Sequence, residues 1–167
     1  RLHVGARSTV YRGRRLADDA PVIMKVANAN HGTRGEAHAM LRRELEILAA
    51  IQSDRVIRGY DVSTFGPEAM LVTEDIGGES LDRHLARGRM SIAGALGVAA
   101  GIVAGLRDVH AAGIIHKDIT PGNIVFNADT GEIRLIDFDI ATAWRTTHQG
   151  FVSPRAEFTP PVIYSRE

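Results

Sequence analysis

The sequence predicts an α+β fold in which a strand-rich first part precedes a helical second part. Up to residue 76, short apolar segments alternate with polar residues and end at turn residues, which is typical of strands. Beyond Gly77-Gly78, the longest apolar segment has the length of a helix. We therefore expect Gly77-Gly78 to form a hinge between the two parts.

Each element of the first part follows from its local pattern. Strands are predicted at residues 9–12, 21–26, 56–62 and 69–74. Residues 36–51 place apolar side chains at three- and four-residue spacing, which predicts a helix; the repeating positions are Met40, Leu41, Glu44, Leu45 and Leu48.

The second part is expected to hold two helices and a pair of strands. A short helix is predicted over 79–86 and a long one over 92–110, with Ser91 as its N-cap. Residues 123–126 and 133–136 are expected to pair as strands across a turn at 128–131. Beyond Asp139 no periodicity remains, and Pro154, Pro160 and Pro161 indicate an extended loop.

Composition describes an ordinary globular chain of 167 residues, 44% apolar and 24% charged. Its 20 basic and 20 acidic side chains cancel, so no bulk charge favours a nucleic-acid partner. Cysteine is absent, which excludes disulfides and thiolate metal sites and fits a reducing compartment. We expect a cytoplasmic protein with no nucleic-acid partner.

A membrane segment is not expected. The first residues lack the apolar core of a signal peptide. The longest uncharged run, Ile92 to Leu106, falls short of the roughly 18–20 residues that span a bilayer, so we interpret it as a buried helix. Its Gly97, Gly101 and Gly105 recur at every fourth residue, which we attribute to close helix packing rather than to a membrane dimer.

Lys25 is the first candidate for chemistry. The basic residues are almost all arginine, and lysine occurs only at positions 25 and 117. A lysine in a strand of such a chain suggests a compact ammonium that binds phosphate oxygens; the alternative is a surface lysine on an edge strand. Glu44 could hold Lys25 by a charge-assisted hydrogen bond, although an isolated helical glutamate is more often solvated.

Asp118, Asn123 and Asp137 form the strongest signal. Asn123 and Asp137 are expected at neighbouring strand ends, where an amide and a carboxylate oxygen suffice to hold Mg²⁺ beside water and phosphate. Asp118, close to Asn123 in the chain, could accept the proton of an attacking hydroxyl. Asp and Asn are also common in turns, but the combined spacing favours phosphoryl transfer from a nucleotide.

The stretch from Leu106 to Asn123, which contains His116-Lys117-Asp118, resembles the catalytic-loop region of eukaryotic-type Ser/Thr protein kinases, most of all the kinase-type domains of bacterial proteins. The resemblance implies a two-lobe fold. Residues 1–76 would be the N-lobe, a five-stranded sheet plus helix 36–51. Residues 77–167 would be an incomplete C-lobe with hinge, long helix 92–110, catalytic loop and activation segment.

The same resemblance implies a site for ATP and Mg²⁺ and a protein substrate. Lys25 would bind the α- and β-phosphates with Glu44 as its anchor, Asp118 would be the catalytic base, and Asn123 and Asp137 would be the metal ligands. The other implied nucleotide contacts are Gly5, Ser8 and Val10 in the phosphate-covering loop, Thr73 behind the adenine, and backbone groups of Glu74 and Ile76. His116 and Phe138 are expected to pack behind the site.

Three departures from the family leave other functions open. The phosphate-covering loop keeps only Gly5, with Ser8 at a usual glycine position. Thr120 stands where these kinases usually have a lysine, and Asp139 replaces the glycine after Asp137-Phe138. A nucleotide-binding module with impaired catalysis is therefore one alternative. A small-molecule kinase of the aminoglycoside phosphotransferase type is another, because the motif His116–Asn123 followed by Ile136–Asp139 also resembles the motifs of such enzymes.

The C-terminal residues Ser165-Arg166-Glu167 resemble the end of an activation segment. We therefore expect a kinase domain truncated after that segment, with further domains in a larger signalling protein. An incomplete C-lobe would expose apolar surface.

Overall fold

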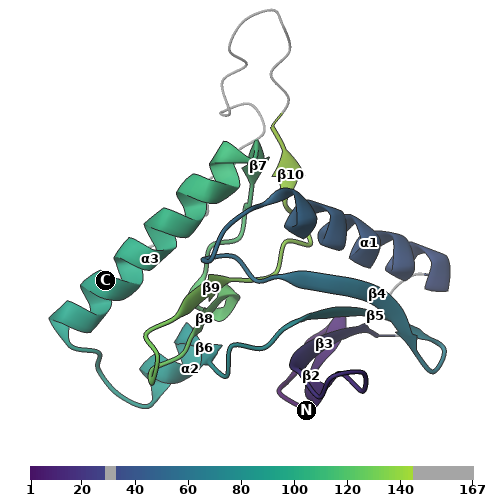
Figure 1. Cartoon of the computed structure of the whole chain (residues 1–167), viewed down its shortest axis with the longest axis horizontal. Helices are drawn as coiled ribbons and strands as arrows, with labels where there is room; N and C mark the ends of the chain where they lie inside the picture. The colour runs from purple at the N-terminus through teal and green to yellow at the C-terminus, as the bar shows by residue number, and fades with distance from the viewer. Residues whose placement is uncertain (29–32, 145–167) are drawn as a thin grey trace, which may run out of the picture.

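Figure 1 shows a computed structural model of the chain, which describes residues 1–28 and 33–144. An antiparallel five-stranded sheet in the order β1-β2-β3-β5-β4 occupies its first part. Its strands are β1 (His3–Val4), β2 (Ser8–Arg14), β3 (Pro21–Ala27), β4 (Gly59–Phe65) and β5 (Glu68–Glu74). The central position of β3 places Lys25 in the middle of the sheet, which rules out the edge-strand alternative.

Helix α1 (Arg34–Ala50) lies along β4 and β5. It begins with a capping box, in which the Thr33 hydroxyl accepts from the Glu36 N–H and the Glu36 carboxylate accepts from the Thr33 N–H. Leu41, Glu44 and Leu48 form its buried face. The 36–51 prediction was therefore correct in type and nearly so in bounds, and it puts Glu44 on the face toward the sheet.

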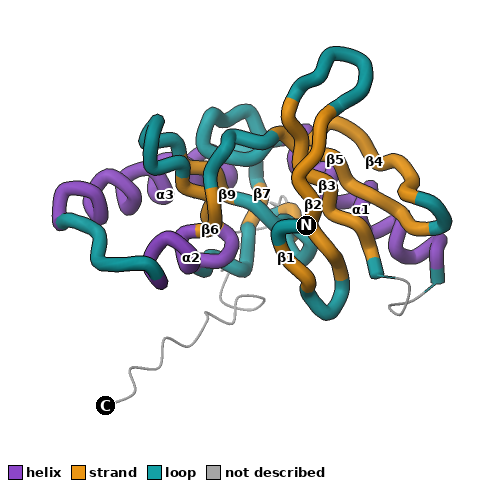
Figure 2. The backbone as a smooth tube through the Cα atoms, turned by 90° about the horizontal axis from the view of Figure 1, so that it is seen from below, coloured by secondary structure: helices purple, strands orange, loops and turns teal. Residues whose placement is uncertain are grey.

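The described residues of the second part combine helices with short strands (Figure 2). Its helices are α2 (Leu81–Ala86) and α3 (Ile92–Ala111), and a 3₁₀ turn covers Pro121–Asn123. Its strands are β6 (Glu79–Ser80), β7 (Ile114–Ile115), β8 (Ile124–Phe126), β9 (Ile133–Leu135) and β10 (Thr142–Ala143). One small sheet has the order β6-β8-β9, and β7 pairs with β10.

The strand predicted at 56–62 was misplaced, because β4 begins at Gly59 and runs to Phe65. Val56 and Ile57 are buried and extended, but they pair with Leu135 of β9 instead of with the large sheet. Their apolar character correctly predicted burial. It could not tell which of two sheets they would join.

The other boundary errors come from very short elements. The helix predicted over 79–86 begins only at Leu81, because Glu79 and Ser80 pair with β8. Asn123 was expected to open a strand, but it ends the 3₁₀ turn and β8 starts at Ile124. Two-residue strands such as β1, β6, β7 and β10 are too short to show a period.

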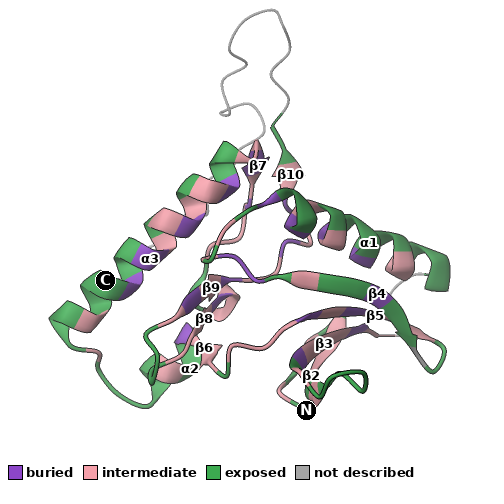
Figure 3. Ribbon diagram, in the orientation of Figure 1, coloured by how far each residue is buried: buried purple, intermediate pink, exposed green. Residues whose placement is uncertain are grey.

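Helix α3 confirms the predicted helix and its cap, since the Ser91 hydroxyl accepts from the Gly94 N–H. The interpretation as a buried helix was wrong, because only one face is covered (Figure 3). On that face a methyl group at Gly101 or Gly105 would approach the side chains of Ile133 and Leu135, respectively, to 3.0 Å or less. These two glycines therefore serve packing against β9, as predicted. For Gly97 the prediction was wrong, because nothing lies within 4 Å of its Cβ position.

By length and composition, α3 is the one helix among the described residues that could cross a membrane. Core helices of soluble proteins share this length and composition, so the property alone does not indicate a membrane span. The absence of a membrane segment stays a prediction.

The hinge glycines have different structural reasons. Gly77 has φ +72°, and its N–H donates to the Asp75 carboxylate. A Cβ on Gly78 would lie 2.7 Å from the Phe126 carbonyl oxygen, so only glycine lets this segment pass β8. The lobe boundary at residue 76 stays a prediction, and the proline-rich loop and the end of the activation segment lie outside the described residues.

Candidate active site

A cleft of about 1320 Å³ lies between the large sheet, α1 and the segments around β8 and β9. The residues predicted to contact nucleotide or metal line this one cleft: Gly5, Ser8, Val10, Lys25, Thr73, Glu74, Ile76, Asn123 and Asp137. Glu44 also lines it, whereas Asp118 does not and reaches it through Asn123. The structure therefore brings together side chains that lie more than 100 positions apart in the sequence.

Lys25 forms the centre of a partly buried charge cluster. Its Nζ donates to Glu44 Oε2 at 2.9 Å and Oε1 at 3.2 Å, and to Asp137 Oδ1 at 2.5 Å. Glu44 is only 3% exposed, and its Oε1 also accepts from the Phe138 N–H at 3.2 Å. The predicted Lys25–Glu44 pair is therefore present, and Asp137 joins it.

Electrostatics favour the ionised form of this cluster. Burial alone would lower the pKa of Lys25, but Glu44 and Asp137 outweigh it and raise that pKa. Burial raises the pKa of Glu44 and by itself would favour a neutral carboxyl, whereas the charge of Lys25 acts to lower that pKa. Both pKa values are raised, which favours the charged form of Lys25 but the neutral form of Glu44. The ion pair is the better description, because both Glu44 oxygens accept hydrogen bonds from Lys25 and Oε1 from a backbone N–H as well.

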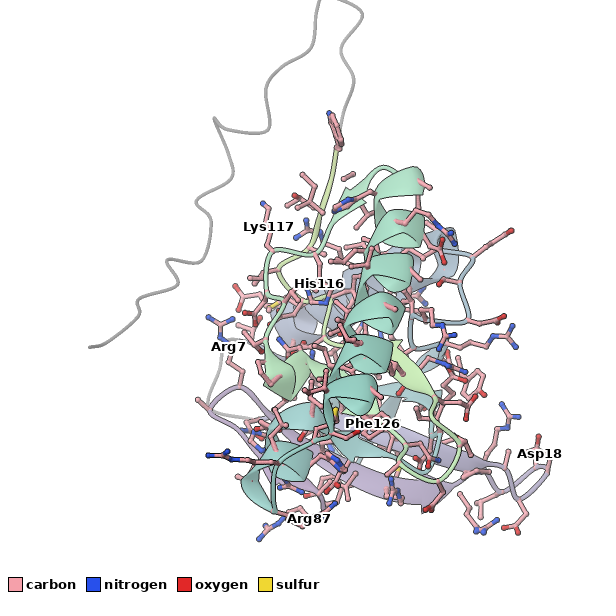
Figure 4. All side chains as sticks on the ribbon, turned by 90° about the vertical axis from the view of Figure 1, so that its left-hand side faces the viewer. Arg7, Asp18, Arg87, His116, Lys117 and Phe126 are labelled. Atoms are coloured by element: carbon pink, nitrogen blue, oxygen red, sulfur yellow. The ribbon has the colours of Figure 1, made fainter. Side chains whose placement is uncertain are left out.

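His116 and Phe138 pack behind the cluster, as predicted. They are 1% and 0% exposed, and their ring centroids lie 4.4 Å apart. The His116 Nδ1 accepts from the Asp118 N–H, so Nε2 carries the proton and donates to the Ile136 carbonyl. Burial lowers the pKa of His116, which matches this neutral tautomer. In Figure 4 His116 lies inside the molecule, whereas Lys117 points outward.

Asp118 is held by Asn123. The Asn123 side-chain amide donates to Asp118 Oδ2 at 2.7 Å and to the Asp118 carbonyl at 3.0 Å. The Asn123 carbonyl accepts from the Ile136 N–H, which joins this loop to the segment that leads to Asp137. The Asp118 carboxylate is therefore oriented before any substrate binds.

Two strained residues flank these carboxylates. Lys117 has φ +71° and Asp137 has φ +65°, in the left-handed region that non-glycine residues seldom adopt. Such conformations cost about 1 kcal/mol or more and persist only where surrounding contacts enforce them. At Lys117 this conformation sets the direction of the chain that leads into Asp118. At Asp137 it sets the direction of that residue's own side chain, which lines the cleft.

Asn123 and Asp137 fit the needs of magnesium. The hydrogen bonds described for Asn123 use its amide nitrogen, and those for Asp137 use Oδ1, so Asn123 Oδ1 and Asp137 Oδ2 are available at the cleft wall. Two hard oxygens suit an ion that keeps water and phosphate as its other ligands. No cluster of three or more His, Cys, Asp or Glu side chains suited to a metal occurs within residues 1–28 and 33–144.

The cleft wall also contains Thr73, Glu74 and Ile76. Thr73 is buried, in line with its expected place behind the adenine. The Glu74 carboxylate accepts from the Arg58 N–H and from Arg134, so its side chain is engaged elsewhere. The Ile76 carbonyl accepts from Asn127 at 2.7 Å. Of the backbone groups expected to meet the base, the Ile76 carbonyl is therefore already used.

Sequence reasoning missed several polar residues that shape the cleft. Arg12 of β2 binds the Asp75 carboxylate at 2.5 Å and the Gly78 carbonyl at 2.9 Å, which ties the hinge to the sheet. Asn127 and Asn28 fasten backbone segments in the same way. Isolated Arg and Asn residues are common on surfaces and in turns, so no pattern distinguished them.

Comparison of the chain with known protein families identifies the family to which it belongs. The chain matches the family described as "Protein kinase domain" over residues 2–164, and it therefore belongs to that family. The incomplete two-lobe kinase fold expected from the resemblance is consistent with this assignment.

Several of the similar relatives are bacterial. The chain is 33% identical over 140 residues to "Serine/threonine-protein kinase PknL" of Mycobacterium bovis, covering 83% of this chain and 35% of the relative. It is 34% identical over 143 residues to "Serine/threonine-protein kinase pkn2" of Myxococcus xanthus, covering 84% and 17%. With "Serine/threonine-protein kinases drp72" of Corynebacterium efficiens it shares 31% over 166 residues, covering 94% and 32%. The chain thus spans about a third or less of these relatives' lengths.

Proposed function

We propose that this chain binds ATP in the cleft and that the natural full-length protein transfers the γ-phosphate to a serine or threonine hydroxyl of a protein substrate. The observation that carries the proposal is the Lys25–Glu44–Asp137 cluster inside a cleft that also holds Asn123, the partner of Asp118. The bacterial relatives, each named as a serine/threonine-protein kinase, support it.

Lys25 would bind phosphate oxygens as a point charge. Glu44 holds the ammonium in place with two oxygens, so the N–H that now donates to Asp137 is the one available to a phosphate oxygen. Because Glu44 fixes the ammonium before ATP binds, binding requires only that a phosphate oxygen replace Asp137 Oδ1 as the acceptor of that N–H. Glu44 is thus a positioning residue for Lys25.

Asp118 would accept the proton of the attacking hydroxyl. Asn123 engages Oδ2, which leaves Oδ1 to receive the proton as the oxygen attacks the γ-phosphorus and the bond to the β-phosphate oxygen breaks. Asn123 and Asp137 would hold Mg²⁺, which when bound neutralises phosphate charge. The chain itself supplies orientation, one fixed cation and one fixed base.

An Asp118→Asn substitution tests the role of Asp118. In the natural full-length protein we expect phosphotransfer to fall by about 10²–10⁴-fold, the usual contribution of a general base. Mg-ATP affinity should change by less than about twofold, because Asp118 lies outside the cleft wall. Undiminished turnover would refute the assigned base.

A second candidate is a nucleotide-binding module with impaired catalysis. It is favoured by Thr120, an exposed residue at the place where the family usually has a lysine. Saturable ATP binding without any phosphorylated product would support this candidate over the first. The carboxylate of Asp139 on the cleft wall favours a small-molecule kinase as a third; phosphorylation of aminoglycosides or amino alcohols, but of no protein, would support it.

Further domains are also proposed for the natural protein, because the relatives are about three or more times the length of the matched region. A cytoplasmic location for the kinase part remains part of this proposal.

A further inference from the structure

Asn28, directly after β3, fastens the loop between β1 and β2. Its side-chain amide donates to the carbonyl oxygens of Gly5 at 2.9 Å and Ala6 at 3.1 Å. Its Oδ1 accepts from the Thr9 hydroxyl at 2.9 Å, and its backbone N–H donates to the Arg7 carbonyl at 2.9 Å. Two carbonyls face the amide nitrogen and a hydroxyl faces the oxygen, so only this orientation of the amide satisfies its neighbours.

The fastened loop is closed upon itself as well. The Gly5 N–H donates to the Ser8 carbonyl at 2.9 Å, and a Cβ on Gly5 would lie 3.3 Å from both that oxygen and the His3 ring. Gly5 and Ser8 line the cleft, and Ser8 lies in β2 two residues before Val10, which pairs with Lys25. A loop with one glycine is thus held in a defined shape by a residue outside it.

A second, weaker contact links the loop to Asp139 on the cleft wall. Arg7 Nη1 lies 3.7 Å from Asp139 Oδ2, and the Arg7 side chain is 66% exposed. Exposed pairs at such distances contribute little, typically about 0–1 kcal/mol. The several hydrogen bonds of half-buried Asn28 therefore dominate the restraint on this loop.

We infer that Asn28 is a positioning residue that presets the loop over the nucleotide phosphates. This inference rests on the proposed function for its ligand, but the preset loop itself exists without nucleotide. Asn28 acts only through the loop backbone, so it should influence ligands that carry phosphates and not the nucleoside alone. Because Asn28 already restrains the loop, the loop loses less conformational freedom when a phosphate ligand binds than a glycine-rich loop would.

The test compares Mg-ATP and adenosine affinities of the purified chain by calorimetry. Asn28→Ala should weaken Mg-ATP binding about tenfold, the effect expected for losing side-chain hydrogen bonds of ordinary strength. Adenosine affinity should stay within about twofold. Thr9→Val should have a smaller effect, and none in the Asn28→Ala background, because the two side chains share one hydrogen bond.

Ser53→Ala is the matched control. Its hydroxyl bridges Asp108 and the Arg55 N–H away from the cleft, so its loss should lower stability without changing either affinity. Amide hydrogen exchange provides a ligand-free readout: the Gly5 N–H should exchange faster in Asn28→Ala than in the wild-type chain or the control.

Each outcome is decisive. Equal weakening of ATP and adenosine, or unchanged Gly5 exchange, would overturn the positioning role. If the Gly5 N–H exchanges faster in Asn28→Ala but the wild-type chain does not bind ATP, the restraint of the loop by Asn28 is supported and the proposed function is refuted.

Discussion

Lys25 is the single residue on which the charge balance of the site depends. It satisfies Glu44, which is 3% exposed and could not otherwise be ionised at that depth. This pairing could be predicted from the sequence, because lysine is rare in the chain and Lys25 occurs in a predicted strand. Glu44 follows nineteen positions later, in a predicted helix. The sequence could not reveal Asn28, since an Asn after a strand has the same local pattern whether or not it binds a distant loop.

Removing the lysine should expose its structural role. We expect Lys25→Met to lower the free energy of unfolding by about 3 kcal/mol, because the Glu44 charge is left buried without a partner. The further change Glu44→Leu in the same chain should restore much of this loss, as measured by urea denaturation. A double variant no more stable than Lys25→Met would contradict the buried-pair account.

His116 should make stability depend on pH near neutrality. Its pKa lies below 6.5 in the folded chain, so the unfolded chain binds more protons as pH falls through 6.5. The contribution is complete above that value and is lost on acidification. Unfolding free energies between about pH 5 and 7 should rise with pH in the wild-type chain and show a smaller slope in His116→Phe. Equal slopes would show that His116 is not held neutral.

Elements were easier to predict than their borders. The periods of α1 and α3 are long enough to define both helices, and the Gly77-Gly78 break was evident. The partner of Val56 and Ile57 was not, because burial is the same in either sheet and only the tertiary fold brings β9 alongside. The two-residue strands likewise depend on neighbours that are distant in the sequence.

The hinge offers a test at this scale. A Cβ at position 78 would meet backbone atoms of Phe126, which cannot move like the end of a side chain. Gly78→Ala should therefore destabilise the chain by about 1–3 kcal/mol. Gly97→Ala is the control, because nothing lies within 4 Å of its Cβ position and alanine favours the helix. Comparable thermal stability of both variants would contradict the close hinge–β8 approach.

At the scale of the whole molecule, α3 presents an apolar face to solvent. Ile92, Leu96 and Val103 are 82%, 66% and 66% exposed in the part of the chain that the structure describes. The expectation that the whole helix is buried was wrong, because only one face is covered. The opposite face is covered by β9, so α3 is amphipathic in its contacts although not in its composition.

This face should bind a hydrophobic dye. We expect the purified 167-residue chain to enhance the fluorescence of an apolar probe such as ANS, and Leu96→Glu with Val103→Glu to reduce that signal substantially. The melting temperature should change little, because both side chains are exposed. An unchanged dye signal would locate the exposed apolar surface elsewhere.

The most direct test of the proposed nucleotide site is the affinity of the chain for ATP with and without Mg²⁺. Because Asn123 and Asp137 place oxygens beside Lys25 in one cleft, magnesium should strengthen ATP binding by about tenfold or more in the wild-type chain and far less in Asp137→Asn. Equal affinity in chelator and in magnesium, or an undiminished magnesium effect in Asp137→Asn, would contradict the account.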